Sequence, residues 1–147
     1  MKNVKILFYA VLLVWSLTAK GEGGSHNVLS ISMRVHSTQK QVILTVKYKN
    51  ITDQKKYIAP GLPALSAYDA KGNELQYLGA MVKRPPFKIS EYIKLKPGDT
   101  YSRRTRIDKL YAFLPKQLYT IELSGGYFDP VGQHDYDAPV VSTQFRR

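Results

Sequence analysis

Residues 79–107 read GAMVKRPPFKISEYIKLKPGDTYSRRTRI and carry the densest strand and turn signals of the chain. A short strand-like segment at residues 92–95 is followed by Lys96-Pro97-Gly98-Asp99 and by a second such segment at residues 100–107. Proline presets φ at the second position of a type II turn, and glycine accepts the positive φ at the third. This stretch therefore predicts a strand, a type II turn and another strand.

The segments on the N-terminal side of this stretch alternate between apolar and polar residues. Residues 31–35 and 42–49 both follow this period of two, which is typical of half-buried strands. Asn50-Ile51-Thr52-Asp53 then interrupts the pattern, and asparagine can hydrogen-bond its own backbone in a turn. The same residues form an Asn-x-Thr sequon, but a turn is the simpler interpretation.

Turn and loop signals separate the remaining segments. Two prolines within residues 59–63 exclude a central strand and indicate a crossing between sheets. Residues 65–68 and 74–78 flank a loop in which Gly72 can take positive φ, and this arrangement predicts a hairpin.

The C-terminal third predicts one helical turn and two more strands. Residues 108–114 fit a helical turn capped by Asp108, with Leu110, Tyr111 and Leu114 facing inward. Strands are then expected at residues 118–124 and 140–145, separated by a loop.

Short strands with turn chemistry between them, and no long helix, indicate an all-β fold. We predict an immunoglobulin-like β-sandwich of seven to eight antiparallel strands, preceded by a signal peptide. The Cys-Trp-Cys core of antibody domains is absent, because the chain has no cysteine. Tyr119 is expected to cap a strand corner through its hydroxyl.

The N-terminus has the features of a signal peptide, which we place at residues 1–21. Two lysines precede an apolar run at residues 6–17, and small residues follow it. The run is shorter than the roughly 20 residues of a spanning helix, so cleavage is expected rather than membrane anchoring. Residues 22–147 would then form a single periplasmic or secreted domain, stabilised without disulfides.

The chain is strongly basic, with a formal net charge of +11. Removing the three lysines of residues 1–21 leaves 19 basic and 11 acidic residues, a net charge of +8. Such a charge favours acidic partners in general. No basic helix, zinc-finger spacing or RNA-binding aromatic motif is present, so we expect no nucleic-acid partner.

Four segments occur in an order that resembles a known domain. They are Val-Lys-Arg-Pro-Pro at 82–86, Glu-Tyr-Ile-Lys-Leu-Lys-Pro-Gly-Asp at 91–99, Asp-Lys-Leu-Tyr at 108–111 and Tyr-Thr-Ile at 119–121. Over residues 31–123 the chain resembles the N-terminal β-sandwich domain associated with deuterolysin-type, lysine-specific zinc metalloendopeptidases. The resemblance implies a sandwich with an auxiliary, protein-contacting role. Residues 60–65 and the loop after residue 126 depart from it.

The catalytic part of that family has no counterpart in the sequence. A zinc peptidase needs two histidines one helical turn apart and a glutamate between them. His26, His36 and His134 form no His-Glu-x-x-His motif, and no Gly-x-Ser-x-Gly elbow or phosphate loop is present. We therefore expect no enzyme activity, no catalytic residues and no cofactor.

One loop has residue types that can bind metals, namely Asp129, His134, Asp135 and Asp137. Their oxygen and imidazole ligands would suit calcium or a transition metal. Because the spacing matches no known metal loop, a solvated acidic loop is the favoured interpretation, and we assign no metal site.

Basic residues supply the candidate binding surface. Alternation places Arg104 and Arg106 on one strand face, opposite Arg103. Charged faces are more often simply solvated, or protect edge strands from aggregation. Tyr101 and Tyr127 could be aromatic anchors or core residues. The residues that we predict to bind a partner are Lys83, Arg84, Tyr92, Arg104 and Arg106.

The sequence thus favours an exported, non-catalytic binding module that contacts another protein, with a peptidase-modulating, inhibitory or immunity-type role. The alternative is a basic binder of an anionic cell-envelope polymer such as lipopolysaccharide or polysaccharide. Binding of a polymer should depend strongly on salt, whereas binding of a protein should depend more on buried aromatic contacts.

Overall fold

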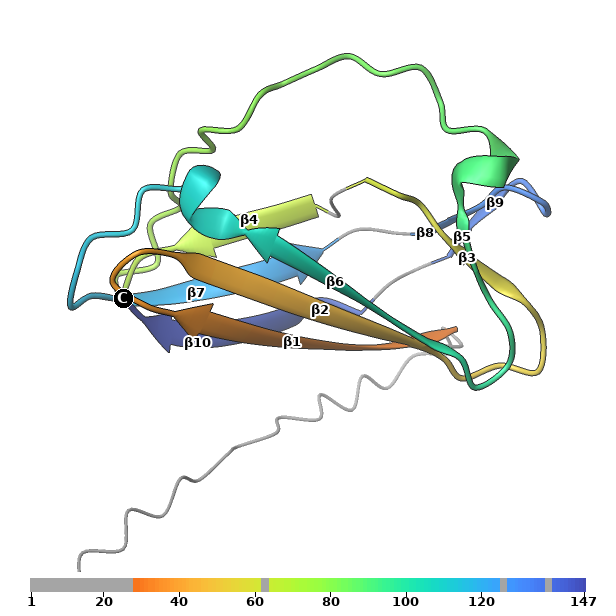
Figure 1. The fold of residues 1–147 in the computed structure, drawn as a ribbon, viewed down its shortest axis with the longest axis horizontal. Helices are drawn as coiled ribbons and strands as arrows, with labels where there is room; N and C mark the ends of the chain where they lie inside the picture. The colour runs from red at the N-terminus through yellow and green to blue at the C-terminus, as the bar shows by residue number, and fades with distance from the viewer. Residues whose placement is uncertain (1–27, 62–63, 125–126, 137–138) are drawn as a thin grey trace, which may run out of the picture.

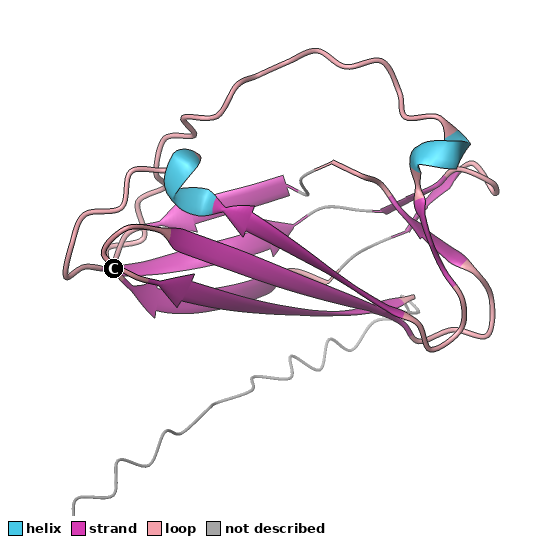
Figure 2. Ribbon diagram, in the orientation of Figure 1, coloured by secondary structure: helices cyan, strands magenta, loops and turns pink. Residues whose placement is uncertain are grey.

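The computed structural model describes residues 28–61, 64–124, 127–136 and 139–147, so the predicted signal peptide lies outside the described residues. These residues form an all-β chain of antiparallel strands with two short 3-10 turns and no α-helix (Figures 1 and 2). Among them, no helix is long and apolar enough to cross a membrane. The strands are β1 (Leu29–Ser37), β2 (Val42–Asn50), β3 (Lys56–Ile58), β4 (Ala64–Tyr68), β5 (Ile93–Leu95), β6 (Thr100–Arg106), β7 (Leu118–Ser124), β8 (Tyr127–Asp129), β9 (His134–Tyr136) and β10 (Val141–Arg146), and the 3-10 turns are η1 (Ile89–Glu91) and η2 (Ile107–Lys109).

The strands of the described residues number ten, whereas the sequence predicted seven or eight. The difference arises from β3, β8 and β9, which the sequence did not predict, and from the predicted strand at residues 74–78, which does not form. Such short strands have no clear period of their own, and they exist because each pairs with another: β3 with β5, and β8 with β9.

Two three-stranded sheets make up most of the molecule, in the orders β1-β2-β6 and β10-β7-β4. Figure 1 shows one sheet in front of the other, with β1 running beside β10. The sheets therefore meet along that side, and on the other side their outer strands are β6 and β4.

One hydrophobic cluster receives side chains from both of these sheets. Val42, Leu44, Val46 and Tyr48 of β2 are all buried, while the residues between them are more exposed. The second sheet contributes Ala67, Tyr119, Ile121, Leu123 and Phe145 to the same cluster. Successive strand residues point to opposite faces. Because these side chains face the core, Thr45, Lys47 and Lys49 of β2 lie on the outer face of the sheet.

Asn50, the last residue of β2, is fully buried and joins three segments. Its Nδ2 donates to the carbonyl oxygens of Gln54 (2.7 Å) and Leu95 (2.9 Å), and its Oδ1 accepts from the N–H of Thr52 (3.0 Å). The predicted turn after Asn50 is confirmed by this side-chain bond to Thr52. Asn50 therefore acts as a buried structural residue. The side-chain nitrogen of this sequon asparagine donates both of its hydrogen bonds within the fold.

The predicted type II turn is confirmed and packs against Asn50. Gly98 has φ of +80°, and the N–H of Asp99 donates to Lys96 O (3.0 Å). The Gly98 N–H donates to Asn50 O (3.0 Å), so the turn is attached directly to the end of β2.

Tyr119 forms the strand corner that the sequence predicted. The phenol is buried at the start of β7, and its oxygen accepts from the N–H of Leu114 (2.7 Å). This bond fixes the approach of the preceding chain to the strand, as in the tyrosine corners of sandwich domains.

The predicted hairpin of residues 65–78 forms only in part. Gly72 has the expected positive φ, and Asp69 N–H donates to Asn73 O, so the turn is present. The return strand is wrong, since only the single bridge between Tyr68 and Glu74 forms. After this bridge the chain runs alongside the segment that follows η2. The Leu78 N–H donates to Leu110 O, and the Tyr77 ring packs edge to face on the Tyr111 ring.

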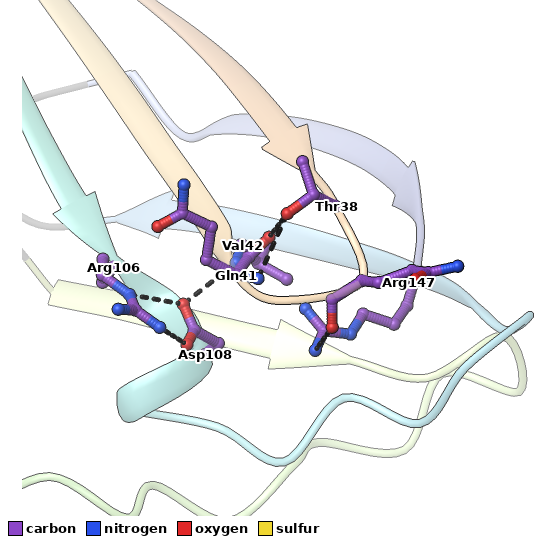
Figure 3. Close-up of polar contacts among 7 residues, drawn as sticks. Thr38, Gln41, Val42, Arg106, Asp108 and Arg147 are labelled. Carbon is purple, nitrogen blue, oxygen red and sulfur yellow. Dashed lines mark hydrogen bonds and ion pairs between the residues drawn. The ribbon is translucent and has the colours of Figure 1, made fainter.

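The predicted helical turn at residues 108–114 is the shorter η2. Asp108 lies within this turn and does not cap it, because its carboxylate accepts from the Val42 N–H (2.9 Å) and pairs with Arg106 (2.5 Å; Figure 3). Tyr111 is buried as expected, but Leu114 is 57% exposed, so its predicted inward position is wrong. Ile107 is buried at this end of the sheet.

Candidate functional site

The outer face of the β1-β2-β6 sheet is the largest basic surface that the strand pattern creates. Five of its side chains are lysine or arginine, most of the others carry hydroxyl groups, and none is acidic. We call these twelve residues the basic face: Ser30, Ser32, Arg34, His36, Ile43, Thr45, Lys47, Lys49, Thr100, Ser102, Arg104 and Arg106.

Strand register brings the charges of the basic face together. Thr45 of β2 pairs with Arg34 on one side and with Arg104 on the other. Neighbouring strands are about 4.8 Å apart, so the backbones of the two arginines are separated by roughly 10 Å. Lys47 occupies the next outward position on β2. Like charges at this spacing oppose one another unless an anion lies between them.

Arg106 differs from the other cations of the basic face because it has a partner. Its guanidinium pairs with the Asp108 carboxylate at 2.5 Å (Figure 3). This hydrogen bond lowers the pKa of Asp108 and raises the pKa of Arg106. Among the described residues, no such partner is found for Arg34, Lys47 or Arg104, so their charges remain available to a ligand.

Arg103 has a structural role on the opposite face of β6. Its guanidinium donates to the carbonyl oxygens of Ala59 (3.0 Å) and Gly61, and lies 5.7 Å from the Tyr101 ring. The crossing that these carbonyls belong to leads from β3 to β4 in another sheet, as the prolines predicted. Arg103 therefore attaches this crossing to β6.

Tyr101 and Tyr127 belong to the packing around Tyr48. Tyr101 stacks on Tyr48 at 6.4 Å between ring centroids, and Tyr127 meets it edge to face at 5.9 Å. Burial raises the pKa of Tyr48 and of Tyr127, an effect that the nearby Arg103 guanidinium partly offsets. Of the two interpretations that the sequence allowed for these tyrosines, the structure supports the core residue.

Lys83 and Arg84 belong to the long loop before η1, and Tyr92 directly follows η1. Figure 1 shows the long loop before η1 arching beyond the outer strands β4 and β6. The Arg84 guanidinium lies 4.9 Å from the Phe87 ring, which in turn packs edge to face on Tyr92. The five predicted residues therefore form two groups, and no described contact joins Arg84 and Tyr92 to Arg104 and Arg106.

This loop also exposes apolar side chains. Met81 is 92% exposed and Val82 is 72% exposed. They border a shallow, open hollow of about 330 Å³ whose lining is Ala64, Leu65, Tyr77, Ala80, Met81, Val82 and Leu110. The hollow has no charged residue in its lining, so it differs chemically from the basic face.

Three basic-face cations were missed by the sequence prediction: Arg34, Lys47 and Lys49. The signal for each was its polar position in an alternating strand. What the sequence did not reveal was that β1, β2 and β6 are neighbours, and only that order places these residues beside Arg104.

The outer edge of β4 is closed by the chain itself. Ala67 O accepts from the Leu75 N–H (2.7 Å), and Leu65 O accepts from the Tyr111 hydroxyl (2.7 Å). Both carbonyl groups are on the side of β4 that faces away from β7. An incoming strand would have to displace these bonds.

Among the described residues, the outer edge of β6 has no such closing bonds. The hydrogen bond at the end of the β2–β6 ladder shows which main-chain groups of β6 point away from β2. Asn50 N–H donates to Asp99 O (3.0 Å), immediately beyond the register pair Lys49 and Thr100. Hydrogen-bonded and non-hydrogen-bonded pairs alternate along an antiparallel ladder. The main-chain groups that point away from β2 are therefore those of Thr100, Ser102, Arg104 and Arg106.

Arg106 is the N-cap of η2, so its C=O belongs to that turn. No described residue outside the β2–β6 ladder hydrogen-bonds to the main chain of Thr100, Ser102 or Arg104. Their N–H and C=O groups form an open strand edge that adjoins the basic face. Unpaired edges of this kind can accept another strand.

The predicted acidic loop is mostly the β8–β9 hairpin. The Asp129 carboxylate accepts from the Val131 N–H (2.9 Å) and the Tyr136 hydroxyl (2.9 Å). Burial and this contact raise the pKa of Tyr136 to about 12. Lys56 Nζ also donates to the Tyr136 hydroxyl (3.3 Å), which ties the hairpin to β3. Asp129 thus has a structural use within the hairpin.

The described residues contain no group of three or more metal-ligating side chains. Of the residues considered for a metal, Asp137 lies outside the described residues.

No protein-family model matches the chain, and no curated protein matches it.

Proposed function

We propose that this chain is an exported, non-catalytic binding module that holds an acidic partner protein on its basic face. The observation that carries the proposal is the arrangement of Arg34, Lys47 and Arg104, which share one outer sheet face without an acidic residue among them. Such a surface attracts anionic partners and speeds their association.

The proposal includes an immunoglobulin-like sandwich as the scaffold and cleavage of residues 1–21 on export to the periplasm or outside the cell. The shared core of the two three-stranded sheets and the Tyr119 hydroxyl bond to Leu114 support the sandwich. The resemblance to the peptidase-associated β-sandwich domain supports a role in contacting another protein, with inhibition, modulation or immunity as the biological outcome.

A protein partner is favoured over an anionic envelope polymer because of the open edge of β6. Its main-chain N–H and C=O groups, at Thr100, Ser102 and Arg104, adjoin the basic face. A polypeptide has complementary main-chain groups, whereas a polysaccharide would use only the charges.

Binding to poly-L-glutamate, followed across a salt series, tests the proposal. We expect residues 22–147 to bind poly-L-glutamate in 50 mM salt and to lose about tenfold or more in affinity at 300 mM, because salt screens exposed charges. Dextran sulfate serves as the polysaccharide comparison. Absence of binding to poly-L-glutamate in 50 mM salt would contradict the proposal, and binding to dextran sulfate alone would favour the polymer alternative.

A further inference from the structure

We infer that the partner adds an extended, acidic segment as a new strand along the outer edge of β6. This inference rests on the proposed function, because it names how the partner protein is held. The site is the strand Thr100–Arg106, and the ligand class is a β-strand with acidic residues at every second position.

The main chain of β6 supplies the first half of the argument. Thr100, Ser102 and Arg104 direct an N–H and a C=O away from β2, and no described residue outside the ladder uses them. Arg106 adds an N–H, while its C=O belongs to η2. At the comparable position in the other sheet, the Leu75 N–H and the Tyr111 hydroxyl occupy the carbonyls of β4. The molecule therefore closes one outer edge and leaves the neighbouring one available to a strand.

The charges of β6 supply the second half. The sequence of the strand, Thr-Tyr-Ser-Arg-Arg-Thr-Arg, has three arginines and no acidic residue. Ser102, Arg104 and Arg106 project onto the basic face, so the outward side chains of an added strand would lie beside them. Acidic residues at alternate positions of the added strand would place every carboxylate on this face.

The same charges disfavour a second copy of this chain as the strand that pairs with β6. Pairing of β6 with β6 of another copy would bring arginines opposite or diagonal to arginines, and like charges across a strand pair destabilise it. An acidic strand has the opposite effect. Arginine at this edge therefore selects a partner and also protects the free protein from self-association.

Two blocked peptides of equal composition and charge provide the binding test. One alternates threonine and glutamate four times, and the other carries the same residues as repeated Glu-Glu-Thr-Thr. Only the alternating peptide can present all its glutamates on one face of a strand. We expect it to bind about tenfold more tightly, as measured by fluorescence anisotropy of labelled peptides at low salt.

A proline variant tests whether the main chain of β6 takes part. Ser102→Pro removes an N–H that points away from β2, so the ladder with β2 is retained, as for prolines on edge strands. We expect this variant to lose about tenfold or more in affinity for the alternating peptide and to keep its affinity for poly-L-glutamate. Ser102→Ala is the matched control and should bind both as the unmodified protein does.

Amide hydrogen exchange of the unmodified protein keeps the inference testable even if Ser102→Pro does not fold. The alternating peptide should slow exchange at Ser102, Arg104 and Arg106, while Tyr101 and Arg103, already bonded to β2, should be slow with or without peptide.

Equal binding of the two peptides, with no change in exchange at Ser102, Arg104 and Arg106, would overturn strand addition and leave the acidic-partner proposal intact. Failure of both peptides and of poly-L-glutamate to bind at low salt would overturn both.

Discussion

Replacing Asn50 with alanine is expected to lower the free energy of unfolding by about 3 kcal/mol or more. The side chain is fully buried and its amide bonds to Gln54 O, Leu95 O and the Thr52 N–H. Alanine leaves these polar groups without a partner at the junction of β2 and β5. Each such group costs about 1–3 kcal/mol when it stays buried.

Urea unfolding followed by circular dichroism measures this loss. Asn73→Ala is a suitable control, because Asn73 is exposed and its amide bonds only to Asp69 within its own turn. We expect the control to change stability by well under half of the Asn50 effect. A loss below about 1 kcal/mol for Asn50→Ala would contradict the structural role that we assign to this residue.

The second large effect concerns binding. Reversing two charges of the basic face, with Arg34→Glu and Arg104→Glu together, is expected to weaken binding of poly-L-glutamate by about 100-fold at low salt. Both side chains are exposed, and no described residue pairs with them, so the fold should be unaffected. The change converts a pair of attractive charges into a pair of repulsive ones at the centre of the face.

Lys83→Glu with Arg84→Glu is the matched control for this prediction. It changes the net charge by the same amount, but it does so in the loop before η1. Isothermal titration calorimetry of both double variants separates a local effect from a general one. Equal losses in the two variants would mean that net charge alone drives binding, and would remove the basic face as the site.

Local sequence signals predicted the parts of the fold that depend on neighbouring residues. Pro97 and Gly98 specify the type II turn, and the alternation of residues 42–49 specifies the two faces of β2. Of the four three-residue strands, β5 was expected within residues 92–95, whereas β3, β8 and β9 were not predictable in this way, because so short a segment has no period of its own and depends on its pairing partner.

The candidate site also combines features that local sequence predicts with features that depend on strand pairing. Alternation alone placed Arg104 and Arg106 on one face of β6, and the structure confirms that placement. Arg34 and Lys47 join them only through the order β1-β2-β6, which depends on tertiary pairing. Lys83 and Arg84 were grouped with Arg104 because all are basic, but they belong to the long loop before η1, where the Arg84 guanidinium lies over the Phe87 ring.

Chemical-shift mapping of isotope-labelled residues 22–147, titrated with the alternating threonine-glutamate peptide, tests the central claim most directly. We predict that the largest amide shifts occur at Arg34, Lys47 and along β6, with little change in the loop around Met81 and Arg84. Shifts confined to that loop would contradict the assignment of the basic face as the binding site.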